Sequence, residues 1–171
     1  MVGYKCFKIE FDDEINVVVI TGNGKGFCAG GDISTMGDNS ANAARKRLYF
    51  VHPLFKSIIN SNKIYIAAVN GVAAGNGYSL ACACDFRFAA TSAKFAPSFM
   101  KIGLVPDCAL LYTLPRIIGL NKTKELLLLN KILFAAQAME LGLVNQLADN
   151  QNQLLQITRE FASEIRRNSP I

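Results

Sequence analysis

Two apolar segments, each followed by a glycine-rich turn, constrain the fold of this chain most strongly. Residues 16–21 (NVVVIT) and 64–69 (IYIAAV) are apolar runs rich in β-branched residues, which predicts buried strands. The glycine turns that come after them are Gly30-Gly31 and Gly75-Asn76-Gly77. Two such turns can direct two main-chain N–H groups at one oxygen atom, the usual arrangement for holding a developing enolate or oxyanion.

Helical segments separate these strands along the chain. Apolar spacing predicts helices over residues 40–59, 107–118, 122–130, 135–141 and 154–167, and a small-residue helix runs from Gly75 through Cys84. Pro115 is expected to kink its helix or to end it early. Short strands are expected around Phe27 and over 85–89, where polar and apolar residues alternate. Strands that alternate with helices indicate an α/β fold with crossover connections.

Composition excludes several classes of protein. The 171 residues suffice for one domain, and 51% hydrophobic with 18% charged residues is a globular composition. No apolar run approaches the ~20 residues that cross a bilayer, and the first ten residues lack a signal-peptide core, so we expect a cytoplasmic protein without a membrane partner. No nucleic-acid recognition motif accompanies the net charge of +5, so nucleic acid is not expected as a partner.

Two readings remain open for the basic residues. The densest basic positions are Arg45-Lys46-Arg47, Lys122 with Lys124, and Arg166-Arg167. They form either solvated helix faces or an attraction for an anionic ligand such as a CoA phosphate.

The cysteines and the one histidine do not predict a metal site. Cys82 and Cys84 lie two apart, a spacing that suits neither a redox motif nor zinc, so we expect apolar core residues. His52 is expected in the core or at the surface, and no metal cluster is expected around it.

Three stretches, in order and at matching separations, resemble the enoyl-CoA hydratase/isomerase (crotonase) family. VVVITGNGKGFCAGGDI is similar to the family's strand, turn and first oxyanion loop, and IAAVNGVAAGNGYSLACACDFRFAATSAKF to its second oxyanion loop, helix and next strand. The stretch from IGLVPDCALL to GLVNQL resembles the family's helical segment and its closing G-L-V strand. The matching region covers residues 17–147.

The resemblance implies a fold and an assembly. It implies a single crotonase-like core domain over 1–171, a ββα spiral that is shortened at both ends, with the N-terminal strand region and C-terminal trimerisation helices of the family reduced or absent. It also implies a homo-oligomer, a trimer or hexamer, and an acyl-CoA thioester as the small-molecule substrate. No cofactor beyond that substrate is expected.

The resemblance also implies site residues. The backbone N–H groups of Gly31 and Asn76 fall at the two oxyanion positions, where a donor is typically worth ~3–4 kcal/mol in the transition state. Asn76 also opens a helix, whose dipole favours negative charge. The residues expected to contact substrate are Ala29, Asp32, Ile33, Gly75, Ser79 and Phe99.

The carboxylates distinguish between reactions. Family hydratases use two glutamates, and the matching positions here are Ser79 and Phe99, neither of which can act as a base. An isomerase needs one base, and Asp107 falls where several family isomerases carry theirs. The resemblance is therefore closest to the single-carboxylate enoyl-CoA isomerases.

Asp107 has a second reading. An Asp just after Pro106 at a helix start is also a good capping residue. The helix dipole there would lower the pKa of Asp107 and make it a weaker base, unless an apolar pocket offset it. Phe99, Leu104, Leu110 and Leu111 are the candidates for that pocket. Tyr78 and Tyr112 either reach the pocket or serve as core aromatics.

Three functions are thus compatible with the sequence. The first is an enoyl-CoA isomerase that moves a double bond through an enolate held by the oxyanion hole. The second is an enoyl-CoA hydratase-like enzyme with an atypical base. The third is a non-catalytic CoA-binding or assembly protein with the same fold.

Overall fold

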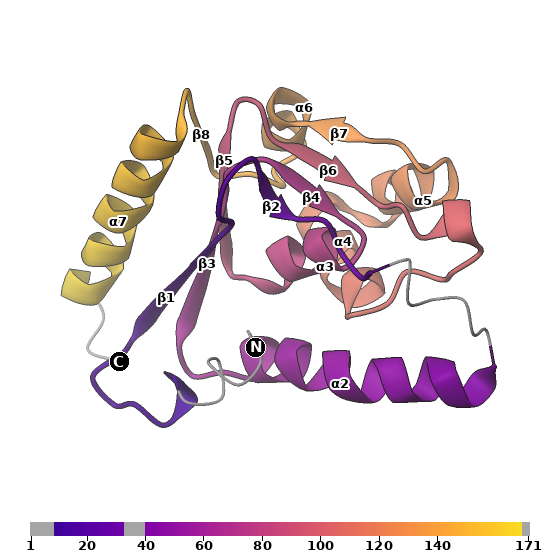
Figure 1. Ribbon diagram of the computed structural model, residues 1–171. Coiled ribbons are helices and arrows are strands. Elements are labelled where there is room, and N and C mark those ends of the chain that lie inside the picture. The colour runs from indigo at the N-terminus through magenta and orange to yellow at the C-terminus, as the bar shows by residue number, and fades with distance from the viewer. Residues whose placement is uncertain (1–8, 33–39, 169–171) are drawn as a thin grey trace.

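The computed structural model describes residues 9–32 and 40–168, which build two four-stranded sheets (Figure 1). The strands of the first sheet are all parallel, in the order β1 (Val17–Thr21), β3 (Ile64–Val69), β5 (Phe86–Ala90) and β8 (Gln146–Ala148). The second sheet has the order β2 (Gly26–Cys28), β4 (Val72–Ala74), β6 (Lys94–Ala96) and β7 (Leu133–Phe134). Its first three strands are parallel, and β7 is antiparallel to β6.

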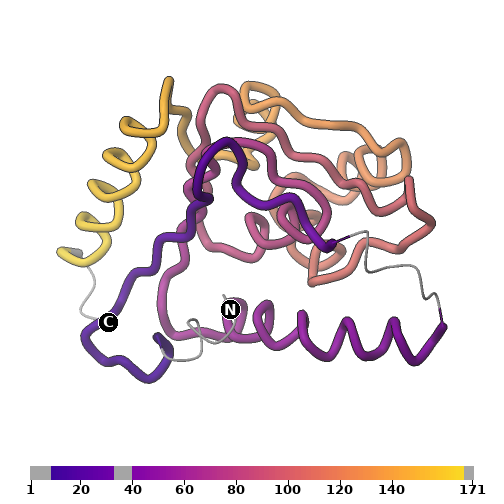
Figure 2. Tube along the Cα trace, viewed as in Figure 1, coloured from indigo at the N-terminus to yellow at the C-terminus, as the bar shows by residue number. Residues whose placement is uncertain are grey.

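Successive strands alternate between the two sheets. β1 and β2 enter different sheets, and so do β3 and β4, then β5 and β6. Helices α2 (Ala41–Ile59) and α3 (Asn76–Ala83) make the crossovers between these pairs. The Cα trace in Figure 2 follows this repeated turn from indigo to magenta. The topology confirms the predicted α/β fold, a spiral of ββα turns.

The central strands are buried on both faces, as their apolar sequences predict. Five of the six residues of β3 are buried. The strand expected over 85–89 is confirmed as β5, and its alternating sequence does not mark a solvent face, because Arg87 is buried as well. The guanidinium of Arg87 donates to the main-chain oxygens of Leu143 at 2.7 Å, Cys84 at 2.5 Å and Asp85 at 3.2 Å, which satisfies the buried charge.

The long helix α2 begins where the sequence predicts. Ser40 is its N-cap, and the Ser40 hydroxyl accepts a hydrogen bond from the Ala43 N–H at 3.2 Å. Pro53 lies inside this helix, and Phe55 and Ile58 face the core. α2 runs below α3 in Figure 1 and contacts it.

The remaining helices lie in the second half of the chain. They are the 3-10 turn η2 (Met100–Ile102), α4 (Leu110–Ile118), α5 (Leu120–Leu128), α6 (Ala135–Glu140) and α7 (Gln151–Asn168). α7 covers the face of the first sheet opposite the main core (Figure 1), where Ile157 and Phe161 pack on Ile66 and Phe88. Of the helices in the described ranges, none is both long and apolar enough to cross a membrane.

Two local expectations are wrong, and one of the two alternatives for Pro115, an early stop, is excluded. Leu143 and Val144 are buried in a turn, not in a strand, and the closing strand β8 begins two residues later. Pro115 does not end its helix, since α4 continues to Ile118. The same helix begins at Leu110, three residues after the predicted start, because the two preceding residues have left-handed backbone conformations.

Candidate functional site

The two glycine turns lie side by side at the ends of β2 and β4. A Cβ built at Gly30 would stand 2.7 Å from the carbonyl oxygen of Ala74 and 3.3 Å from the amide nitrogen of Asn76. Gly30 also has φ +92°, which favours glycine. The first turn therefore approaches the start of α3 at backbone contact distance.

Asn76 needs no unusual backbone conformation to occupy its position. The left-handed residue is Gly75, the N-cap of α3, with φ +51°. Asn76 then begins the helix with an ordinary negative φ. Among the described residues, none accepts a main-chain hydrogen bond from the N–H of Gly31 or of Asn76. Within the described residues both amides are therefore without a main-chain acceptor, and their oxyanion role stays a prediction.

The residues predicted to contact substrate fall into two groups. Ala29 and Asp32 are exposed beside the Gly30-Gly31 turn, and Ile33 lies outside the described residues. Gly75 is half-buried at the second turn, where its N–H donates to the Ala96 oxygen at 2.9 Å. Ala29, Asp32 and Gly75 therefore lie at the paired turns, and none of the three is buried.

Ser79 and Phe99 form the buried group. The Ser79 side chain is fully buried, and its hydroxyl lies 3.3 Å from the main-chain oxygen of Asp107 and 3.5 Å from that of Gly75. Phe99 belongs to the main core. Ser79 therefore links α3 to the turn that carries the candidate base.

Asp107 does not cap α4. The N-cap is Ala109, and it makes no side-chain cap hydrogen bond, so the capping interpretation of Asp107 is wrong. Only the main-chain oxygen of Asp107 contributes to the helix start, by accepting from the Leu110 N–H at 3.0 Å. The Oδ1 atom is buried and makes no hydrogen bond within the described part of the chain. An acceptor of this kind is available to a reacting group.

The turn after Asp107 is strained. Cys108 and Ala109 have φ values of +52° and +64°, a region that costs non-glycine residues roughly 1–3 kcal/mol each. The Cys108 Sγ lies within 4.8 Å of a carboxylate oxygen of Asp107. Burial, and then the neighbouring charge of Asp107, raises the pKa of Cys108 far above its usual range. The buried thiol therefore stays protonated at neutral pH.

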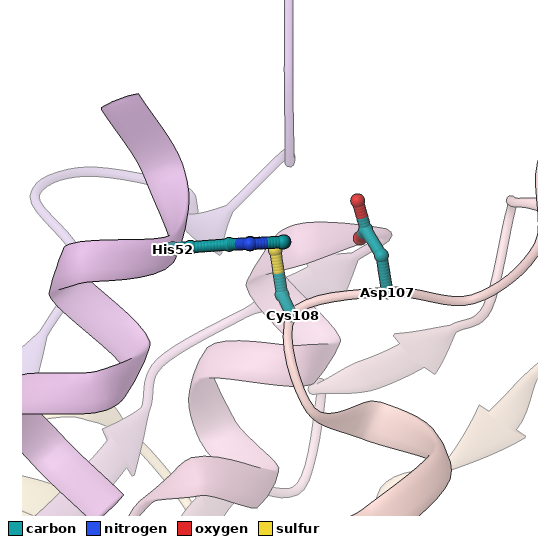
Figure 3. Close-up of side chains that lie close together, drawn as sticks. All are labelled: His52, Asp107 and Cys108. Atoms are coloured by element: carbon teal, nitrogen blue, oxygen red, sulfur yellow. The ribbon is translucent and has the colours of Figure 1, made fainter. Parts of the chain in front are cut away.

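His52 joins this turn from α2. A ring nitrogen of His52, a carboxylate oxygen of Asp107 and the Sγ of Cys108 all lie within 4.8 Å of one another (Figure 3). The expectation that no group of metal ligands could form around His52 is therefore wrong. A sequence signal existed, because position 52 shares a helical face with Leu48 and Phe55, on the apolar stripe of α2.

A groove along α2 leads to the same histidine. It is lined by both basic and apolar side chains, which are Arg45, Leu48, Tyr49, His52, Pro53 and Lys56. His52 therefore belongs both to this groove and to the cluster with Asp107 and Cys108.

The expected apolar pocket around Asp107 is only partly closed. Phe99 and Leu110 are in the core, whereas Leu104 and Leu111 are 42% and 52% exposed. Of the tyrosines considered for this pocket, Tyr78 is a core residue.

Tyr78 is fully buried and packs on Phe95, with ring centroids 5.5 Å apart. Its hydroxyl has no hydrogen-bond partner among the described residues, and burial raises the pKa of Tyr78 well above its usual value. Tyr112 lies at the surface, where its ring stacks under the Arg116 guanidinium at 3.6 Å. Neither tyrosine is therefore positioned to act as an acid or a base beside Asp107.

Comparison with known proteins gives consistent matches. A model of the enoyl-CoA hydratase/isomerase family matches residues 6–171. The chain is 38% identical over 170 residues to the 1,2-epoxyphenylacetyl-CoA isomerase of Escherichia coli, covering 94% of this chain and 64% of the relative. It is 33% identical over 169 residues to the short-chain-enoyl-CoA hydratase of Clostridium acetobutylicum, covering 98% of this chain and 64% of the relative.

Solved structures agree with this match. The crystal structure of an enoyl-CoA hydratase from Bacillus anthracis resembles the fold with a TM-score of 0.92 at 30% identity, over 99% of this chain and 66% of that one. The chain spans less than two thirds of the length of both curated relatives.

Proposed function

The chain belongs to the enoyl-CoA hydratase/isomerase family, and from that premise we propose that it is an enoyl-CoA isomerase with one catalytic carboxylate. Asp107 removes a proton from C2 of a 3-enoyl thioester and returns it at C4. The double bond thereby moves from C3 to C2 with no net change in protons. The main-chain N–H groups of Gly31 and Asn76 hold the negative oxygen of the intermediate dienolate.

The observation that carries this proposal is the buried carboxylate oxygen of Asp107 that has no hydrogen-bond partner among the described residues. The Oδ1 atom of Asp107 is therefore open to a reacting group. The main chain of Asp107 is held by the hydrogen bond from the Ser79 hydroxyl and by the strained turn that follows. Positions 79 and 99 hold a serine and a phenylalanine, so the two-glutamate route to hydration has no counterpart here. The isomerase name of the Escherichia coli relative is consistent with this choice.

The basic groove on α2 supports an acyl-CoA as the ligand. Arg45 and Lys56 line it together with Leu48 and Tyr49. Cations beside an apolar surface suit a ligand that carries phosphates on an organic frame.

Asp107→Asn tests the assignment. The amide keeps the shape of the side chain but cannot accept the proton, so we expect conversion of 3-enoyl-CoA to 2-enoyl-CoA to fall by about 10²–10⁴-fold. Asp149→Asn is the matched control, because it neutralises an exposed carboxylate outside the site. A purified, folded Asp107→Asn protein with the parental rate would refute the role of Asp107.

One observation favours hydration as a second candidate. Hydration needs a group that activates water and a group that delivers a proton, and His52 lies within 4.8 Å of Asp107. Incubation with 2-enoyl-CoA distinguishes the reactions, since a hydratase forms the 3-hydroxyacyl thioester. Binding of acyl-CoA without turnover of either enoyl isomer would instead favour the non-catalytic CoA-binding or assembly role.

A further inference from the structure

Three donor atoms of different chemistry converge where α2 meets the Asp107 turn. The imidazole of His52 extends from the helix toward the Sγ of Cys108, and the Asp107 carboxylate stands on the adjoining residue (Figure 3). His52 and Asp107 are half-buried and Cys108 is buried. The cluster thus joins two segments that are far apart in the sequence and is partly shielded from solvent.

The donor set matches one class of metal ion. Thiolate sulfur together with imidazole nitrogen selects borderline-soft divalent cations, and a carboxylate completes a common zinc ligand set. Zinc bonds of about 2.0–2.3 Å place tetrahedral ligand atoms roughly 3.3–3.7 Å apart. The three atoms already lie within 4.8 Å of one another. Side-chain rotations that shorten these distances by about 1 Å would bring the three atoms to the separation that zinc requires.

Two further observations point to a ligand at this place. The buried Oδ1 of Asp107 is an acceptor without a hydrogen-bond partner among the described residues. His52 is half-buried and also lines the groove on α2, so one ligand of the cluster is accessible from solvent.

We propose that His52, Asp107 and Cys108 form a binding site for a divalent transition-metal ion of the zinc class. The ion forms bonds to the imidazole nitrogen, the carboxylate oxygen and the sulfur, and the thiol proton passes to solvent. Three protein ligands leave a fourth position for water. Occupation of the site blocks Asp107, and this consequence for turnover, unlike the site itself, rests on the proposed function.

Cobalt titration of the full chain tests the site directly. Co²⁺ should bind with a stoichiometry of one per chain and develop thiolate-to-cobalt charge-transfer absorption, and Zn²⁺ should displace it. His52→Ala and Cys108→Ser should each weaken binding at least tenfold, since the loss even of groups that only orient a ligand costs about 10–100-fold. Cys28→Ser is the matched control, because it removes a half-buried thiol outside the cluster.

The outcomes separate this site from the proposed function. Absence of the charge-transfer absorption in the folded protein, or its persistence in Cys108→Ser, overturns the site. Circular dichroism of each variant establishes that a loss of binding is not a loss of folding. Metal binding that leaves isomerisation unchanged upholds the site and contradicts the role of Asp107 in turnover.

Discussion

Gly77→Ala tests the close approach on which the paired turns depend. A Cβ at position 77 would stand 2.1 Å from the carbonyl oxygen of Cys28 and 2.8 Å from the carbonyl carbon and Cβ of the same residue. Two of these three atoms are main chain, so no side-chain rotation relieves the contact. β2 and α3 must separate by 0.9 Å before the Cβ–oxygen distance reaches 3.0 Å, below which real Cβ contacts are essentially never found.

The expected loss of stability is the difference of two effects. Overpacking of a fixed contact costs about 3 kcal/mol, the upper end of the usual range. Alanine is better than glycine by roughly 1 kcal/mol inside a helix, and Gly77 lies in α3. The net loss is about 2 kcal/mol, which lowers the Tm of a chain of this size by about 4–8 °C.

Gly26→Ala is the matched control in the adjoining strand. A Cβ there meets nothing nearer than the Val72 oxygen at 3.8 Å, and Gly26 has no positive φ. This substitution should leave the protein as stable as the parent or stabilise it by up to about 1 kcal/mol, because alanine restricts the unfolded chain.

Denaturant titration of parent and both variants measures the difference. Because Gly77 follows Asn76, the shift of α3 should also move the Asn76 N–H away from Gly30 and lower enoyl-CoA turnover. If Gly77→Ala unfolds at the same denaturant concentration as Gly26→Ala, the close packing of β2 on α3 is refuted.

Three further predictions concern charge and burial. Arg87→Lys should destabilise the fold by about 3 kcal/mol, because one ammonium cannot reach the three main-chain oxygens that the guanidinium bonds. Hydrogen bonds from Lys122 and Lys131 lower the pKa of Glu125 to about 2, so its ionised form stabilises the folded state above the unfolded value of about 4.5, and this contribution is lost as the pH falls toward 2. Glu125→Gln should therefore lower Tm at neutral pH and match the parent near pH 2. Burial raises the pKa of Cys82 from 9.0 to about 12, which lowers its thiolate fraction about a thousandfold, so iodoacetamide should not label Cys82 in the native protein.

Each of these three predictions can be contradicted by the same measurement that tests it. A loss below about 1 kcal/mol in Arg87→Lys, measured by denaturant titration, would mean that the buried carbonyls find other donors. A Tm difference for Glu125→Gln that is as large in acid as at neutral pH would exclude a charge effect. Mass spectrometry that finds Cys82 labelled as fast as the half-buried Cys28 would contradict its burial.

Long periodic elements followed closely from the sequence. The strand over 64–69 and the helix that begins after Ser40 have the predicted bounds, because an apolar run or stripe of that length has only one way to be buried. β4, β6 and β7 were not predicted, because two or three residues carry no period. The strand β5 was predicted, but the burial of Arg87 within it could not be predicted from the sequence. The three oxygens that accept from Arg87 are main-chain atoms that only the fold brings together.

The candidate site was predictable in part for the same reason. Gly30 and Gly75 mark turns because glycine tolerates positive φ, and both have it in the structure. The helix start near Asp107 was misplaced, because Cys108 and Ala109 adopt left-handed conformations that their side chains disfavour. Only surrounding packing can impose such a conformation, and local sequence does not record it.

The amino-acid order alone determined the alternation of strands and helices, the two glycine turns and the carboxylate at position 107. These depend on near neighbours along the chain, whose periods and backbone preferences can be read locally. The tertiary structure alone decided that His52 meets Asp107 and Cys108. That meeting depends on how α2 packs across the spiral, and contacts between segments some fifty residues apart have no local signature.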